Sequence, residues 1–356
     1  MKLKQYIGRH RTNLVTYGVV ILGFVIMQVL SASHMLSSSV EGFLVPICAY
    51  VVLAVSLNLV VGISGELSLG HAGFMGVGAF TGIIVAALLK TVIASKVLLL
   101  IVAIVCGGVM AGLFGVVIGL PVMRLRGDYL AIVTLAFGEI LKNLINNMYV
   151  GSDANGVHFV IGTEKPLLAD GGSMIINGPM GATGVAKLAT FPIGFALILV
   201  TLFVVLNLIN SREGRAIKAV RDNRIAAESV GINVTAFRLK AFVVSAFLAG
   251  MAGALYGLNY SSLTASKFNF NTSINILVFV VLGGLGNMRG SVIAAALLTV
   301  LPELLRQFSD YRMLIYAIVL ILVMLFTWSP KVKEVWSVVS EKAGGIFKKK
   351  EAGTNE

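Results

Sequence analysis

Residues 97–120 read VLLLIVAIVCGGVMAGLFGVVIGL, a run without a single charged side chain. A helix needs about 20 mostly apolar residues to cross roughly 30 Å of hydrocarbon, so this run can span a bilayer. Comparable apolar runs lie at residues 12–30, 43–61, 72–89, 129–148, 191–209, 241–258, 273–286, 291–304 and 311–328. The sequence therefore predicts an all-α integral membrane protein, a polytopic bundle of about ten transmembrane helices.

The composition agrees with this prediction. Of the 356 residues, 57% are hydrophobic and 12% are charged, and a soluble core could not hide so much apolar surface. Glycines are abundant and recur four residues apart, which lets membrane helices approach closely. We expect such helix contacts at Gly78 and Gly82, Gly108 and Gly112, Gly115 and Gly119, and Gly253 and Gly257.

The net charge of +12 comes from basic residues beside the apolar runs, which membrane orientation explains without nucleic acid. Basic segments at 2–11, 124–126, 212–240 and 331–350, together with Arg289, all fall on one side if the N-terminus is cytoplasmic. We expect one transmembrane domain at 1–330, with a cytoplasmic loop at 210–240 and an extracytoplasmic loop at 149–190. A basic cytoplasmic tail at 331–356 completes the chain, so both termini are cytoplasmic.

Polar residues interrupt the apolar pattern between residues 56 and 74, where Asn58, Glu66, Ser68 and His71 lie among glycines. Broken backbone at membrane depth is tolerated only inside protein or beside a watery cavity. The segment is therefore a candidate wall of a substrate path. The alternative is a cytoplasmic turn whose Glu66 and His71 face water.

Glu139 and Lys142 lie three residues apart in the run at 129–148, on one helix face. An ion pair between them would lower the cost of placing either charge in the bilayer. Glu139 is a second candidate for the substrate path, and a structural pair near the interface is the alternative.

The loop at 210–240 predicts a short surface helix. Asp222 or Asn223 can cap it, while Ile225, Ala226, Ala227 and Val230 give it an apolar side. Gly231 supplies a left-handed end. Such a helix fits a groove on another protein, because alanines permit close approach.

Three blocks resemble the permeases of ABC importers, specifically the branched-chain amino-acid (LivM-type) family. They are GELSLGHAGFMGVGAF at 65–80, GRAIKAVRDN at 214–223 and GGLGNMRG at 283–290. The family's cytoplasmic loop carries a Glu-Ala-Ala pattern that docks into an ATPase subunit, and Ala226-Ala227-Glu228 followed by Gly231 is a permuted match. The coupling residues implied are Gly214, Arg215, Ala216, Lys218, Ala219, Arg221, Asp222, Asn223, Ala226, Ala227, Glu228, Gly231 and Ile232.

The resemblance also implies partners and a location. It implies two cytoplasmic ATPase subunits that bind ATP, a homologous second permease subunit and an extracytoplasmic substrate-binding protein, in a bacterial plasma (inner) membrane surrounded by lipid. Branched-chain amino acids are the implied substrate, and urea, short amides or other amino acids are the alternatives within the family.

The sequence contains no phosphate-binding glycine loop, and its four histidines lie in separate segments without companion ligands. We therefore expect no cofactor, no metal and no catalytic residue in this chain. A secondary transporter that works alone, with Glu66, Glu139 and Lys142 as ion carriers, is a second class of function. A membrane enzyme is a third, but no nucleophile or carboxylate pair converges.

Overall fold

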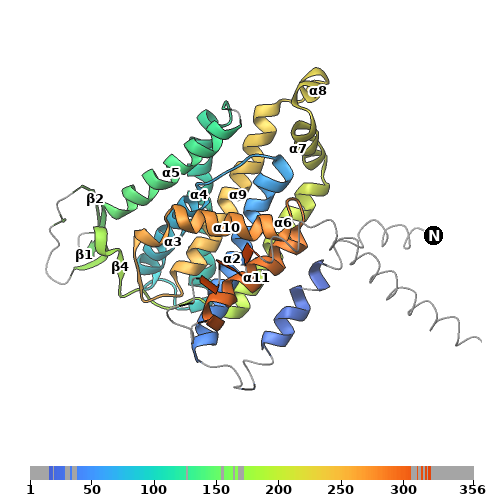
Figure 1. Cartoon of the computed structure of the whole chain (residues 1–356). Helices are drawn as coiled ribbons and strands as arrows, with labels where there is room; N and C mark the ends of the chain where they lie inside the picture. The colour runs from blue at the N-terminus through green and yellow to red at the C-terminus, as the bar shows by residue number, and fades with distance from the viewer. Residues whose placement is uncertain are drawn as a thin grey trace, which may run out of the picture. The chain divides into compact units, whose positions relative to one another are not determined.

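The computed structural model describes residues 38–305, apart from gaps at 126, 154–155, 163–164 and 167–171. It also describes 16–18, 20–28, 33 and a few positions between 311 and 321. The chain divides into two units, Met1–Thr299 and Val300–Glu356. The first unit carries the elements discussed below, except that the last helix ends in the second unit (Figure 1). The predicted basic tail at 331–356 and most of the predicted helix at 311–328 lie outside the described residues.

Helices dominate the described chain. The longer ones are α2 (Ser38–Asn58), α3 (His71–Leu89), α4 (Lys96–Val122), α5 (Asp128–Asn146), α6 (Phe191–Asn210), α9 (Val234–Gly257), α10 (Phe270–Gly283) and α11 (Met288–Leu304). Within the described residues, seven helical segments are long and apolar enough to cross a membrane, and Thr16–Gln28 is a shorter apolar helix. The chain is thus a mostly helical, multi-pass membrane protein, and the predicted count of about ten spans stays a prediction.

The segment predicted as the loop 149–190 contains short strands, which the all-α prediction did not include. An antiparallel five-stranded sheet has the order β2-β1-β3-β4-β5. The strands are β1 (Met148–Asp153), β2 (Gly156–Ile161), β3 (Ser173–Asn177), β4 (Ala182–Thr183) and β5 (Ser262–Leu263). Short 3₁₀ turns, η2 (Gly178–Met180) and η3 (Ala265–Lys267), accompany them.

The hairpin of β1 and β2 shows why the sheet was missed. Met148 pairs with Ile161 and Asp153 with Gly156, and the Gly156 amide donates to Asp153 Oδ1 at 3.1 Å. Gly151 and Gly156, which are turn formers in sequence, lie within β1 and β2. Strands of two to six residues are too short for a reliable hydrophobic period, and β5 comes from a distant part of the chain.

The helices have two distinct ends. The sheet follows α5, and β5 follows α9, so we call this side the sheet end. Between α6 and α9 lie two further helices, α7 (Arg212–Asp222) and α8 (Arg224–Ser229), which mark the loop end (Figure 1). Because α9 runs from α8 to β5, it connects the two ends directly.

Glycines bring α3, α4 and α9 into close contact, as their spacing predicts. Gly78 of α3 lies against the backbone of Gly250 in α9, and Gly107 of α4 lies against Gly78 and Ala254. The glycines of all four predicted pairs face a neighbouring helix. These contacts rely on dispersion between close backbones, because lipid offers little hydrophobic drive for helix association.

Replacing Gly78 with alanine tests this packing. The added methyl group would collide with the Gly250 backbone, which cannot rotate away. We expect Gly78→Ala to lower the free energy of unfolding by about 1–3 kcal/mol, as overpacking does. Gly42→Ala in α2 is the matched control, because nothing lies within 4 Å of its added methyl group. Thermal unfolding in detergent measures the stability of both variants. Equal melting temperatures would contradict the close contact between Gly78 and Gly250.

Candidate functional site

The chain breaks between α2 and α3, as the polar residues at 56–74 predict. After Asn58 the helix widens into a π-helical turn, η1 (Leu59–Ser64), and ends at Gly65 with φ +76°. This left-handed conformation favours glycine. Residues 66–70 have no helical structure, and α3 begins at His71.

Asn58 connects this break to the turn between α10 and α11. Its side chain is fully buried, donates to Ser291 Oγ at 2.8 Å, and accepts from the Gly286 amide at 2.8 Å. Gly62 lies so close to Gly286 that a Cβ would come within 3 Å of its Cα. The break between α2 and α3 and the turn between α10 and α11 therefore meet at Asn58.

His71 is buried in a second hydrogen-bonded group. Its Nε2 lies 2.9 Å from Ser56 Oγ, and that hydroxyl donates to the Leu53 carbonyl at 2.9 Å. Because the Ser56 hydroxyl hydrogen is used in that bond, His71 Nε2 carries a hydrogen and donates it to Ser56 Oγ. Ser245 of α9 donates to the Ser56 carbonyl at 2.6 Å, so α2, α3 and α9 are joined here.

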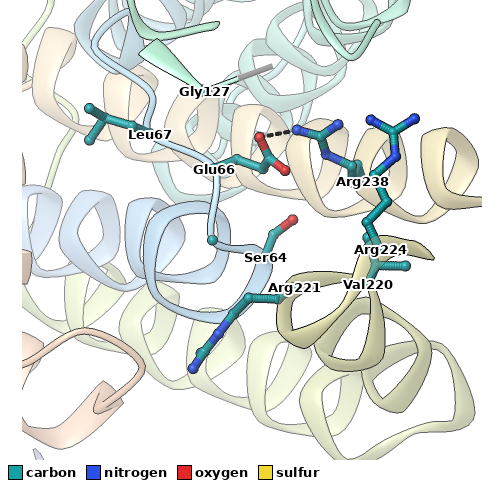
Figure 2. Close-up of a pocket in the computed structure, with 9 residues that line it drawn as sticks. Ser64, Glu66, Leu67, Gly127, Val220, Arg221, Arg224 and Arg238 are labelled. Atoms are coloured by element: carbon teal, nitrogen blue, oxygen red, sulfur yellow. Dashed lines mark ion pairs between the residues drawn. The ribbon is translucent and has the colours of Figure 1, made fainter. Parts of the chain in front are cut away.

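Glu66 forms a buried ion pair with Arg238 of α9 (Figure 2). The side chains are 13% and 7% exposed, and Arg238 Nη1 also donates to the Met123 carbonyl at 3.4 Å. With His71 at 2% exposure, the alternative of a turn facing water is wrong. The sequence did not predict Arg238 as a site residue, because the helix was expected to begin at residue 241 and α9 begins at Val234. Nothing in the local pattern distinguishes Arg238 from a solvated loop arginine.

Ser68 and Glu139 lie apart from these groups. Ser68 is 1% exposed, and its Oγ has no hydrogen-bond partner among the described residues. Glu139 pairs with Lys142, as predicted, and its Oε1 accepts from the Phe270 amide at the start of α10 at 3.1 Å. No hydrogen bond or ion pair in the described chain joins Glu139 to Asn58, Glu66 or His71, so these candidates do not form one cluster.

Most of the residues predicted to take part in coupling form the predicted short helix and one before it. Gly214 through Asp222 lie on α7, while Ala226, Ala227 and Glu228 lie on α8. Asn223 caps α8 by accepting from the Ala226 amide at 3.0 Å, and Gly231 has φ +83°, both as predicted.

The predicted apolar side of α8 divides into two parts. Ala227 is buried and packs in a small core with Val220, Val234 and Ile232. Ile225 and Val230 are instead 79% and 73% exposed. The short helix therefore presents large apolar side chains at the loop end.

Arg221 links this segment to the break. Its Nη1 donates to the Gly62 carbonyl in η1 at 2.6 Å, and its side chain packs against Gly65 (Figure 2). Sequence reasoning placed Arg221 in the coupling loop but did not predict this contact. Arg221 and the Glu66–Arg238 pair thus hold the loop end against the interrupted helix.

Buried polar groups at interrupted membrane helices are typical of membrane transport proteins. The chain matches the family "Branched-chain amino acid transport system / permease component" over residues 39–325, and it belongs to this family. It is 36% identical over 295 residues to the high-affinity branched-chain amino acid transport system permease protein LivM of Escherichia coli K12. LivM of Salmonella typhimurium is 35% identical over the same length, and each match covers 79% of this chain and 67% of the relative.

The high-affinity branched-chain amino acid transport system permease protein LivH of Escherichia coli K12 is 25% identical over 289 residues, covering 78% of this chain and 88% of LivH. No solved structure matches the chain.

A double-variant cycle tests the Glu66–Arg238 pair. Removing one partner leaves an uncompensated buried charge, so we expect Glu66→Met or Arg238→Met alone to cost about 3–5 kcal/mol of stability. The double variant recovers most of that loss, because no charge stays buried. Thermal unfolding of the four proteins in detergent measures the cycle. Additive losses in the double variant would show that the two side chains do not interact.

Proposed function

We propose that this chain is the permease subunit of an ATP-binding-cassette importer, and that α7 and α8 transmit ATPase motion to the membrane helices. The Arg221 contact with Gly62 carries this proposal, because it joins the surface segment to the interrupted helix across 159 residues of sequence. Membership of the permease family supports it.

The loop end is then cytoplasmic and the sheet end extracytoplasmic, in a bacterial plasma membrane with both termini inside. Exposed Ile225 and Val230 suit a groove on the ATPase, since an amphipathic helix binds a groove through such apolar side chains. ATP would bind only to the two ATPase partners. The substrate-binding protein would dock at the sheet end.

The coupling mechanism follows from the contacts. Closure of the ATPases displaces α8, and the small core of Ala227 and Val220 transfers that displacement to α7. Arg221 passes it to η1, and Asn58 passes it to the turn between α10 and α11. Rigid movement of these elements converts an outward-open path to an inward-open one.

A second, homologous permease subunit completes the path. The similarity to both LivM and LivH, two permease proteins named for one E. coli system, supports a pair of different subunits. Branched-chain amino acids are the proposed substrates, because the names of these relatives state that transport role. The buried hydroxyl, amide and imidazole groups of Ser68, Asn58 and His71 suit a brief passage of a zwitterion rather than tight binding.

A transporter that works alone fits the structure less well. The charges it would use are paired, Glu66 with Arg238 and Glu139 with Lys142. An ion carrier must exchange its proton or ion in each cycle, and a buried salt bridge opposes that exchange.

Ile225→Asp tests the coupling role. We expect it to lower ATPase co-purification and leucine uptake in proteoliposomes by about tenfold, because a charge replaces an apolar contact worth roughly 1.4 kcal/mol or more. The melting temperature stays unchanged, since the side chain is 79% exposed.

Two variants control this experiment. Ile225→Val keeps the apolar contact and should retain uptake. Val92→Asp places the same charge at a position that is 76% exposed and precedes α4 at the sheet end, and should retain the ATPase. If Ile225→Asp co-purifies with the ATPase as well as Val92→Asp does, α8 is not the docking helix.

A further inference from the structure

A cavity of about 400 Å³ opens at the loop end, where the break, α7, α8 and the start of α9 meet (Figure 2). Its lining includes Ser64 and Glu66 from the break, Arg221 from α7, Arg224 from α8 and Arg238 from α9. Elements far apart in the sequence thus contribute hydrogen-bond donors to one space.

Two of these donors are buried without a partner. Arg238 has a side chain that is 7% exposed, yet its Nε has no hydrogen-bond partner among the described residues. The same holds for Ser64 Oγ, in a residue that is 2% exposed. Buried donors are paired in the great majority of cases, so two orphans on one cavity indicate a ligand that accepts hydrogen bonds.

The arginines keep further donors for such a ligand. Arg224 pairs with Glu228 through Nε at 2.9 Å, and that contact does not use its terminal nitrogens. Arg221 contributes less, because its Nη1 donates to the Gly62 carbonyl and, in Figure 2, its guanidinium points away from those of Arg224 and Arg238. Glu66 is the acidic residue among those that line the cavity, and Arg238 neutralises it. In Figure 2 the Arg224 side chain points to the same part of the pocket as the Arg238 guanidinium.

We infer that this cavity binds a phosphate group. Guanidinium forks match phosphate oxygens, and a tetrahedral oxyanion offers enough acceptors for donors that converge from separate elements. A carboxylate has only two oxygens. The phosphate has two possible sources, free phosphate from the cytoplasm or the headgroup of an anionic phospholipid, because basic pockets between membrane helices bind such headgroups.

A bound phosphate would join α8, α9 and the break at one point. It would stiffen the segment through which ATPase motion reaches the helices. This effect on transport rests on the proposed function, whereas the binding rests on the cavity alone.

Titration of inorganic phosphate into the purified full chain tests the binding, by calorimetry in neutral detergent and in phosphatidylcholine nanodiscs. We expect saturable binding that weakens about tenfold or more in Arg224→Gln and in Ser64→Ala, because each removes a donor to a charged acceptor. Arg215→Gln is the matched control. It removes the same charge from exposed α7 surface outside the cavity lining, and binding should stay within about twofold.

Nanodiscs that contain phosphatidylglycerol distinguish the two sources. If the headgroup occupies the cavity, native mass spectrometry finds phosphatidylglycerol retained by the wild type and lost in Arg224→Gln, and free phosphate no longer binds. If free phosphate is the ligand, its binding is the same in both kinds of nanodisc. Either result supports the inference.

Three results would overturn the phosphate inference. The first is no saturable binding of either ligand, which means that the cavity holds water, and the second is equal weakening of binding in Arg215→Gln. The third is displacement of phosphate by an equal concentration of acetate, which indicates that the ligand is a carboxylate from a partner protein. Unchanged melting temperatures exclude misfolding of the variants. Absence of binding of both ligands to a wild type that still supports uptake overturns this inference alone, whereas failure of ATPase docking with intact phosphate binding overturns the proposed function alone.

Discussion

The break between α2 and α3 leaves backbone groups without helical partners inside a membrane protein, and the rest of the site follows from satisfying them. Lipid offers no hydrogen bonds, so side chains of the protein must. Arg221 bonds the Gly62 carbonyl, Thr134 bonds the Leu69 amide and Ser273 bonds the Ala72 amide. These partners come from α7, α5 and α10. The break therefore ties three separate elements to one short segment.

The second interruption, between α10 and α11, depends on the first. Its Gly286 amide finds its acceptor in Asn58, just before η1 begins. The Asn58 side-chain amide also donates to Ser291 Oγ in α11, so both its oxygen and its nitrogen are used. A displacement of η1 cannot leave the turn in place without breaking two buried hydrogen bonds. Two interruptions that share one side chain are thus coupled mechanically.

Sequence reasoning located many of these residues but not their partners. Asn58 and His71 were conspicuous because polar residues among glycines are rare in apolar runs. The cap at Asn223 and the pair of Glu139 with Lys142 were predicted because both are local, three residues apart. The bonds that build the site are not local.

The long-range contacts explain the remaining errors. The bond from Arg221 to Gly62, the pair of Glu66 with Arg238 and the bond from Asn58 to Ser291 join residues more than 150 positions apart. A single sequence contains no period that marks such pairs. The sheet was missed for a related reason, since β5 joins β4 from the far side of α9. By contrast, the glycine faces were predicted, because a spacing of four residues already places them on one face.

The Glu66–Arg238 pair illustrates what a buried charge contributes at a junction between helices. Apolar residues of similar volume can hold two helices as firmly, so net stability does not explain the pair. Apolar faces, however, also slide past one another at little cost. Arg238 bonds both Glu66 and the Met123 carbonyl, and these fixed acceptors define one offset of α9 against the break and against the end of α4. In the proposed mechanism such a fixed offset is needed, because slippage of the break against α9 would absorb the displacement of η1 before it reached Asn58.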